Sequence, residues 1–176
     1  SEALWMVLVM WFFSRLRALS FSLSVAIPSG LAAHPHVFVD TGLTLVLDDT
    51  QRVIAVEVTW SYDDLYSLLV MQDMGLDMDG DGILTEEELA QVDGWDMQWI
   101  DGYEGDLYLT DADGNPVALG SQIPLSTDVV DARLVSRHRR QLVEPVVADG
   151  LALRAYDPEF YTAYDLTLGV DVPAPC

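Results

Sequence analysis

Hydrophobic and polar residues alternate in the second half of residues 37–62, and this period of two predicts a β-strand with one buried face. The first half is also rich in apolar and β-branched residues, and the polar residues Asp48–Gln51 separate the two halves. The stretch therefore predicts a β-hairpin. Its inward-facing set in the second strand is Ile54, Val56, Val58 and Trp60.

From about residue 62 to residue 103 the apolar spacing becomes helical. Ser61 followed by Asp64 predicts the start of a first helix, which places Leu65, Leu68 and Leu69 on one side. A second helix is predicted to begin near Thr85 and to fade near Gly102. Its apolar face is predicted to hold Leu89, Val92 and Trp99.

The remainder of the chain is predicted to be β. "DLYLTDADGNPVAL" is typical of a hairpin around an Asp-Gly-Asn-Pro turn, and residues 129–143, 151–156 and 162–168 are predicted strands. The fold class is therefore α+β. We expect an antiparallel β-sandwich built from hairpins, with one helical insertion at about residues 62–103.

The N-terminal region has the pattern of an export signal. Residues 3–14 and 18–33 carry no charge, and only Arg15 and Arg17 divide them. If translation begins at Met10, a basic segment precedes an apolar one and small residues lead to a cleavage site near Ala32/Ala33. The alternative is an uncleaved anchor, for which the apolar segment is short. We predict a signal peptide at residues 1–33 and a single mature domain at 34–176, not embedded in a membrane.

Composition sets the size and charge of that domain. The chain has 176 residues, 51% of them hydrophobic, enough for one domain with a substantial core. Removing residues 1–33 leaves 6 basic and 28 acidic residues, a formal charge of −22. Such a charge excludes nucleic acid as a partner and favours cations. The arginines cluster in "RLVSRHRR", which either contacts an acidic partner or neutralises the protein's own acidic faces.

The stretch "DMDGDGILTEEE", residues 77–88, has the spacing of an EF-hand calcium loop. Gly82 at position 6 allows the sharp turn, Leu84 is placed to pack inward, and Thr85 with Glu88 forms a capping box. The insertion is thus expected to carry one EF-hand-like site for calcium; the alternative is an acidic loop that binds no ion. The predicted ligands are Asp77, Asp79, Asp81, Ile83 through its carbonyl, Thr85 and Glu88.

A second candidate site opens the mature domain in "HPHVFVD". Pro35 keeps the chain extended, so the imidazoles of His34 and His36 face the same way and can approach one ion. Asp40 falls on the same face and is a weaker candidate ligand; His138 could join only if its strand lies beside this one. Imidazole with carboxylate suits nickel, cobalt, zinc or copper. The alternative is a frayed terminus, and the lone Cys176 is predicted to be an unstructured chain end.

Taken together, "HPHVFVD", "DLYSLLV", "DMDGDGILTEEEL" and "YDPEFYTAY" resemble domain-of-unknown-function family one-thousand-and-seven, across residues 34–176. The resemblance implies a periplasmic component of an uncharacterised ABC-type transport system, linked to nickel/cobalt efflux permeases. It therefore implies metal handling in the periplasm beside an inner-membrane metal permease or transporter. In "YDPEFYTAY" we expect a turn at Asp157 and Pro158, with Asp157 a distant candidate ligand. The aromatic residues expected to fill the core there are Tyr156, Phe160, Tyr161 and Tyr164.

Three function classes follow from these features. The first is a periplasmic metal-binding accessory protein of a transition-metal transport system, with a structural calcium site. The second is a calcium-stabilised protein–protein interaction module of the cell envelope. The third, an enzyme holding copper at an N-terminal histidine, is disfavoured because no nucleophile motif or paired acid–base constellation is present. We therefore do not expect an enzyme.

Overall fold

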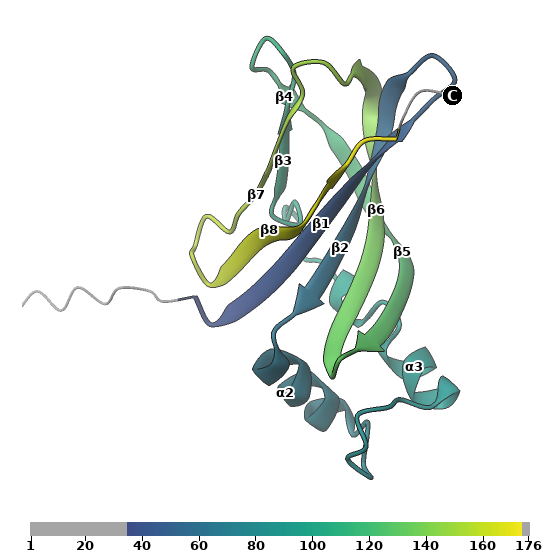
Figure 1. The fold of residues 1–176 in the computed structure, drawn as a ribbon. Coiled ribbons are helices and arrows are strands. Elements are labelled where there is room, and N and C mark those ends of the chain that lie inside the picture. Colours follow the sequence, from purple (N-terminus) through teal and green to yellow (C-terminus); the bar gives the residue numbers. More distant parts are fainter. Residues whose placement is uncertain (1–34, 174–176) are drawn as a thin grey trace, which may run out of the picture. The chain divides into compact units, whose positions relative to one another are not determined.

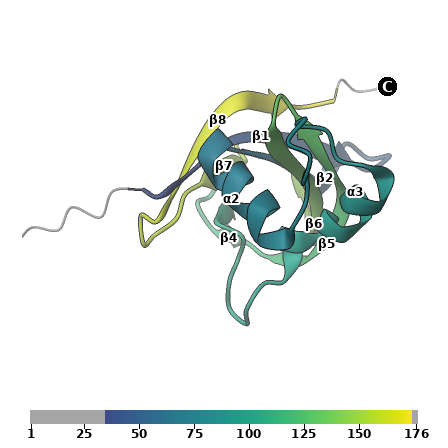
Figure 2. The same ribbon diagram turned by 90° about the horizontal axis from the view of Figure 1, so that it is seen from below.

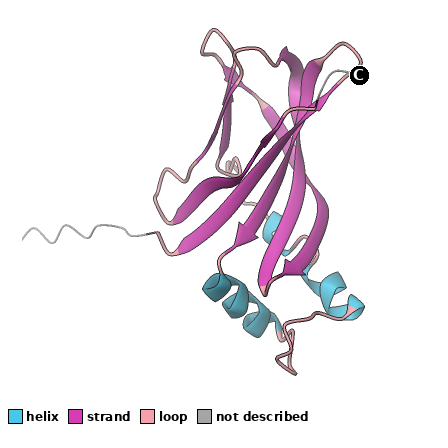
Figure 3. Cartoon of the chain, viewed as in Figure 1, coloured by secondary structure: helices cyan, strands magenta, loops and turns pink. Residues whose placement is uncertain are grey.

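The computed structural model describes residues 35–173, and about half of these residues lie in β-strands (Figures 1 and 3). The main sheet has the strand order β5-β6-β2-β1-β8, and a smaller sheet has the order β4-β3-β7. The strands are β1 (Val37–Leu47), β2 (Arg52–Tyr62), β3 (Leu107–Thr110), β4 (Pro116–Val117), β5 (Leu119–Val130), β6 (Arg133–Val147), β7 (Ala152–Ala155) and β8 (Thr162–Asp171). The described helices are α2 (Asp64–Met74), α3 (Glu86–Val92) and the 3₁₀ helix η1 (Trp95–Met97).

The hairpin predicted from the alternating pattern is confirmed as β1 and β2, which pair in antiparallel register. Asp48 forms its turn, because one carboxylate oxygen accepts hydrogen bonds from the backbone N–H groups of Thr50 and Arg52. Val58 and Trp60 of β2 pack with Leu107 and Leu109 of the smaller sheet in one hydrophobic core. Two open sheets around a shared core are consistent with the predicted sandwich.

The prediction of a wholly antiparallel sheet was wrong at one edge. β8 pairs with β1 in parallel, with Val37 opposite Thr162, so the main sheet is mixed. Parallel neighbours cannot be joined by a tight turn and need a crossover connection. Here the chain leaves the main sheet after β6, forms β7 in the smaller sheet and then returns along β1 (Figure 1).

The strand predicted at residues 129–143 corresponds to β6, but its predicted start was wrong, because the range crosses a hairpin turn. β5 ends at Val130 and β6 begins at Arg133, with Asp131 and Ala132 both at positive φ, 52° and 63°. Two-residue hairpin turns of this kind usually contain glycine or asparagine, so the sequence Asp-Ala gave no turn signal. β5 itself was not predicted.

The first helix of the insertion begins two residues later than expected. Its N-cap is Asp63 instead of Ser61, and the Asp63 carboxylate accepts from the backbone N–H of Tyr66 at 2.9 Å. The side that faces the sheet is polar at its centre, where Ser67 is fully buried and its hydroxyl accepts from the backbone N–H of Leu134 at 2.9 Å. Consequently the leucine side of α2 lies outward. The exposed leucines are Leu65, Leu68 and Leu69.

The second helix begins as predicted and ends earlier. The capping box of Thr85 and Glu88 is confirmed, and Val92 is completely buried. The α-helix stops there, because the C-cap Asp93 is extended, with a ψ of 123°, and Gly94 then adopts a φ of 68° before the short η1 helix. α2 lies against β6 and α3 against β5, at the same end of the main sheet (Figures 1 and 2). Among residues 35–173, no helix combines the length and the apolar character needed to cross a membrane.

Candidate metal centre

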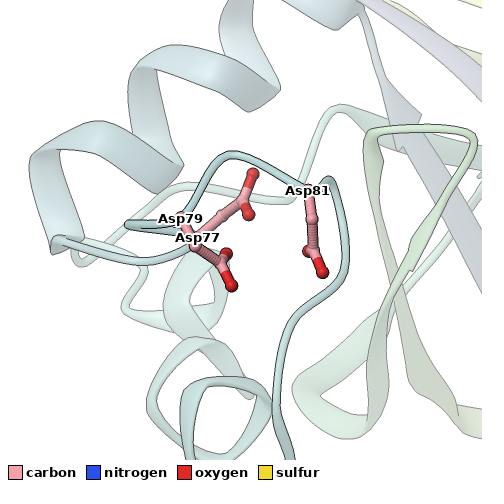
Figure 4. A group of neighbouring side chains, drawn as sticks. All are labelled: Asp77, Asp79 and Asp81. Atoms are coloured by element: carbon pink, nitrogen blue, oxygen red, sulfur yellow. The ribbon is translucent and has the colours of Figure 1, made fainter.

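The acidic loop between α2 and α3 brings three carboxylates together (Figure 4). Asp77, Asp79 and Asp81 each offer one oxygen, and these oxygens lie within 4.8 Å of one another. Calcium holds oxygen ligands at about 2.3–2.6 Å, so ligand oxygens on opposite sides of one ion are about 5 Å apart. The spacing of the three carboxylates therefore fits a single calcium ion. They are the only group of three or more potential metal-ligating side chains at this spacing within residues 35–173.

The backbone of the loop is shaped around the first carboxylate. The N–H of Gly82 is 3.2 Å from both Asp77 oxygens, and the N–H of Ile83 donates to Asp81 at 2.8 Å. Gly82 adopts a φ of 77°, as its position in the motif predicts, and no atom lies within 4 Å of where its Cβ would be. This glycine is therefore required by backbone conformation and not by crowding.

Glu88 closes the loop. One of its oxygens accepts from the backbone N–H of Asp77 at 2.9 Å, and the other accepts from the N–H and hydroxyl of Thr85, both at 2.8 Å. The hydrogen bonds from Thr85 and then Asp77 lower the pKa of the Glu88 carboxyl. Glu88 is thus held in the ionised form that a metal ligand requires.

The loop is anchored to the core on both sides. Leu76 precedes it at 3% exposure, and Leu84, inside it, is buried as predicted. By contrast, Ile83 is exposed at its side chain, which leaves its backbone as the part that belongs to the site. The first four ligand positions, from Asp77 to Ile83, therefore lie between two buried leucines.

The candidate transition-metal residues lie in different places. His34 is outside the described residues, whereas His36 is exposed just before β1, with its ring centroid 5.1 Å from that of Tyr161. Asp40 is on the same face of the strand but already engaged, because Thr167 and Arg133 each donate to its carboxylate at 2.6 Å. These two hydrogen bonds lower the pKa of Asp40. Asp40 is therefore bound into an ion pair and is not free beside His36.

His138 is far from His36 in the sheet. Its strand β6 is separated from β1 by β2, and the pairings His138–Val58 and Val58–Leu43 place it level with Leu43. Seven residues of extended strand separate Leu43 from His36, about 23 Å. The His138 ring is buried against Trp60, with ring centroids 4.5 Å apart, and burial lowers its pKa to about 3. The structure does not bring His138 to the N-terminal site.

Comparison with known proteins gives a family and no closer relative. A family model described as "Protein of unknown function (DUF1007)" matches residues 19–176. The chain belongs to this family. No curated protein and no solved structure matches it. The match to the DUF1007 family includes the acidic loop and both N-terminal histidines.

The arginine cluster of this DUF1007 chain is neutralised from within. Each of its four arginines forms an ion pair with an acidic residue of the same chain. The cluster therefore neutralises the protein's own acidic faces, which was one of its two interpretations. The pairs are Arg133–Asp40, Arg137–Asp128, Arg139–Glu57 and Arg140–Glu104. The guanidinium groups of all four arginines are thus occupied, and the Arg140 side chain is also buried, at 3% exposure.

The "YDPEFYTAY" stretch of the DUF1007 chain forms the expected turn without filling the core. The Asp157 carboxylate accepts from the backbone N–H groups of Glu159, Tyr161 and Thr162, which occupies it as a turn residue. Its aromatic side chains were predicted to be inside. Three of them are exposed, namely Tyr156, Phe160 and Tyr161, and only Tyr164 packs inward against Trp60.

The sequence did not predict one buried polar group of this DUF1007 chain. Asp96, in η1, accepts from the Tyr62 hydroxyl at 2.8 Å and from the Ser136 hydroxyl, and burial raises its pKa. These bonds attach the segment after α3 to β2 and β6. Nothing local marks Asp96 in the sequence, because its partners are 34 and 40 residues away.

Proposed function

We propose that the protein is a calcium-binding domain of the cell envelope, in which the ion stabilises the helical segment at one end of the main sheet. The convergence of Asp77, Asp79 and Asp81 carries this proposal. The ligand atoms that these three residues offer are all oxygens, which suit a hard cation such as calcium better than zinc or copper. The remaining ligands would be the Ile83 carbonyl and the side chains of Thr85 and Glu88.

The ion would supply positive charge where three carboxylates otherwise repel one another. The chain's own residues shape the loop. Gly82 allows its turn, and Glu88, in the first turn of α3, accepts a hydrogen bond from Asp77 at the start of the loop. The sequence contains one such loop and no second one to pair with it. A structural role with an affinity on the order of 0.1–1 mM suits an exported protein.

Calorimetric titration of the chelator-treated intact protein with calcium chloride tests this proposal. We expect one calcium per chain and a Tm that rises with calcium concentration, because the ion binds the folded state. Asp79→Asn should weaken binding, whereas Asp113→Asn, in the exposed turn between β3 and β4, is the matched control and should not. Absence of binding at millimolar calcium would contradict the proposal.

A second candidate function is that of a periplasmic accessory protein for transition-metal transport. It is supported by the exposed ring of His36 and by the transport system that the family resemblance implies. Because Asp40 is ion-paired and His138 is buried, the site would consist of His34, His36 and, if cleavage leaves His34 first, the α-amino group. The partner would be an inner-membrane metal permease that passes nickel, cobalt, zinc or copper.

The transition-metal site is tested on the mature protein without a tag. Calorimetry with zinc, nickel, cobalt and copper should detect one ion per chain, and His36→Ala should abolish its binding. His138→Gln should leave this binding unchanged, because His138 lies outside the proposed site. Equal metal binding by wild type and His36→Ala would reject the N-terminal site while leaving the calcium proposal unaffected.

The alternative of a calcium-stabilised interaction module rests on a different observation. The leucines of α2 face outward and are not covered by any described part of the chain. Neighbouring exposed leucines of this kind are typical of a protein interaction surface.

A further inference from the structure

A groove of about 650 Å³ lies between α2 and the segment that follows α3; we call it the interhelical groove. Tyr66, Val70 and Met74 are spaced four residues apart on α2, so they line one side of it. Trp95 lines the other side, with its ring centroid 6.1 Å from that of Tyr66. The groove is open to solvent, and its lining combines these apolar side chains with polar ones.

The apolar surface continues from the groove along α2. Leu69 lines the groove at 53% exposure, and Leu65, one turn before it, is 65% exposed. Leu68 adds a third exposed leucine on the next row. Adjacent exposed leucines beside an open groove are typical of a surface that another molecule covers.

The charge around the groove restricts what that molecule can be. Residues 63–106 contain 14 acidic side chains and no lysine, arginine or histidine. Two of these, Asp73 and Asp93, line the groove itself, one from each side. A second copy of this chain, with a net charge of −21, and an anionic lipid surface would both be repelled.

We propose that the interhelical groove binds a basic amphipathic helix of a partner protein. Its apolar side chains lie against Tyr66, Leu69 and Val70, and its lysines or arginines lie beside Asp73 and Asp93. This inference rests on the proposed calcium function, because the loop of residues 77–88 joins the two sides of the groove. The ion would fix the spacing between α2 and α3.

The test uses a defined probe, a fluorescent peptide of about 18 residues with leucine on one helical face and lysine elsewhere. A scrambled peptide of the same composition controls for general charge attraction. Fluorescence anisotropy is measured on the intact protein at about 1 mM calcium and roughly 0.15 M salt. We expect the amphipathic peptide to bind at least about tenfold more tightly than the scrambled one.

Two matched variants assign the binding to the groove. Leu69→Gln should weaken peptide binding at least about tenfold, whereas Leu168→Gln, on β8 and equally exposed at 53%, should not change it. Equal affinity for both peptides, or no effect of Leu69→Gln, would overturn the proposal. Self-association that Leu69→Gln abolishes would also overturn it, because the occupant would then be a second copy.

The calcium titration separates failure of this inference from failure of the proposed function. If calcium binds and the amphipathic peptide does not, the docking inference alone is wrong. If the peptide binds at the groove in wild type without any calcium binding, the calcium function is wrong and the ion does not set the spacing of the groove. Asp79→Asn should lower the affinity for calcium directly and the affinity for the peptide only as a consequence. Excess calcium should therefore restore the peptide affinity of this variant.

Discussion

The backbone N–H of Asp77 donates to the Glu88 carboxylate at 2.9 Å, so the last residue of the acidic loop is bonded to the first. The same carboxylate accepts from Thr85, at the start of α3. One side chain thus closes the loop and caps a helix. These two roles can be separated by substitution, since capping needs a hydrogen-bond acceptor and metal binding needs the charge.

We predict that Glu88→Gln and Glu88→Ala differ in stability without calcium but both lose calcium affinity. Glutamine keeps one acceptor for the capping box, so the Tm of the calcium-free Glu88→Gln protein should stay near that of wild type. Alanine removes the cap and should lower that Tm by a few degrees. Both variants should lose calcium affinity about tenfold or more. Thermal unfolding with and without chelator measures both effects, and a Glu88→Gln protein with wild-type calcium affinity would exclude Glu88 as a ligand.

Local chemistry made part of this structure predictable from the sequence. Asp48 forms hydrogen bonds with residues two and four positions away, and Thr85 forms one with Glu88, three positions away. The turn and the helix cap can therefore be recognised from a few consecutive residues. The positive φ of Gly82 follows from its place in the loop in the same way. The family was predictable as well, because its motifs are short and ordered along the chain.

Long-range contacts explain what the sequence did not predict. α2 turns its leucines outward because buried Ser67 bonds to Leu134, 67 residues away, and no helical period contains that information. The parallel pairing of β8 with β1 depends on where the chain returns after β7. His138 lies in a predicted strand, yet it is buried against Trp60 and Trp99, which are distant from it in the sequence.

Gly82 gives a prediction about backbone strain alone. Its φ is 77° and its Cβ position is empty, so Gly82→Ala should lower the free energy of unfolding of the calcium-free protein by about 1–2 kcal/mol. Gly82→Asn should cost less, because asparagine tolerates left-handed backbone. Urea unfolding of both variants provides the measurement. Equal stability of wild type and Gly82→Ala would show that the loop does not require this conformation.

Asp40 should contribute stability that depends on pH. Thr167 and Arg133 lower its folded pKa below the ordinary value of 3.8, so the folded state favours the ionised form. This contribution is present above about pH 4 and is lost as the pH falls through the lowered pKa. Asp40→Asn should therefore be less stable than wild type at pH 7, and the difference should shrink below pH 4. A difference that is constant from pH 7 to pH 2.5, in urea unfolding, would contradict the ion pair with Arg133.

His138 should also make stability fall as the pH falls, at higher pH values than Asp40 and through burial of a neutral base. Burial against Trp60 and Trp99 lowers its pKa from 6.5 to about 3, so the folded protein holds it neutral while the unfolded chain protonates it. Between these two pKa values the unfolded state binds more protons than the folded state. As the pH falls below 6.5, the free energy of unfolding therefore decreases by up to about 1.4 kcal/mol per pH unit. His138→Phe cannot titrate, so the stability of wild type relative to this variant should decline from pH 7 to pH 4 in urea unfolding. Parallel curves for the two proteins would place His138 in contact with water.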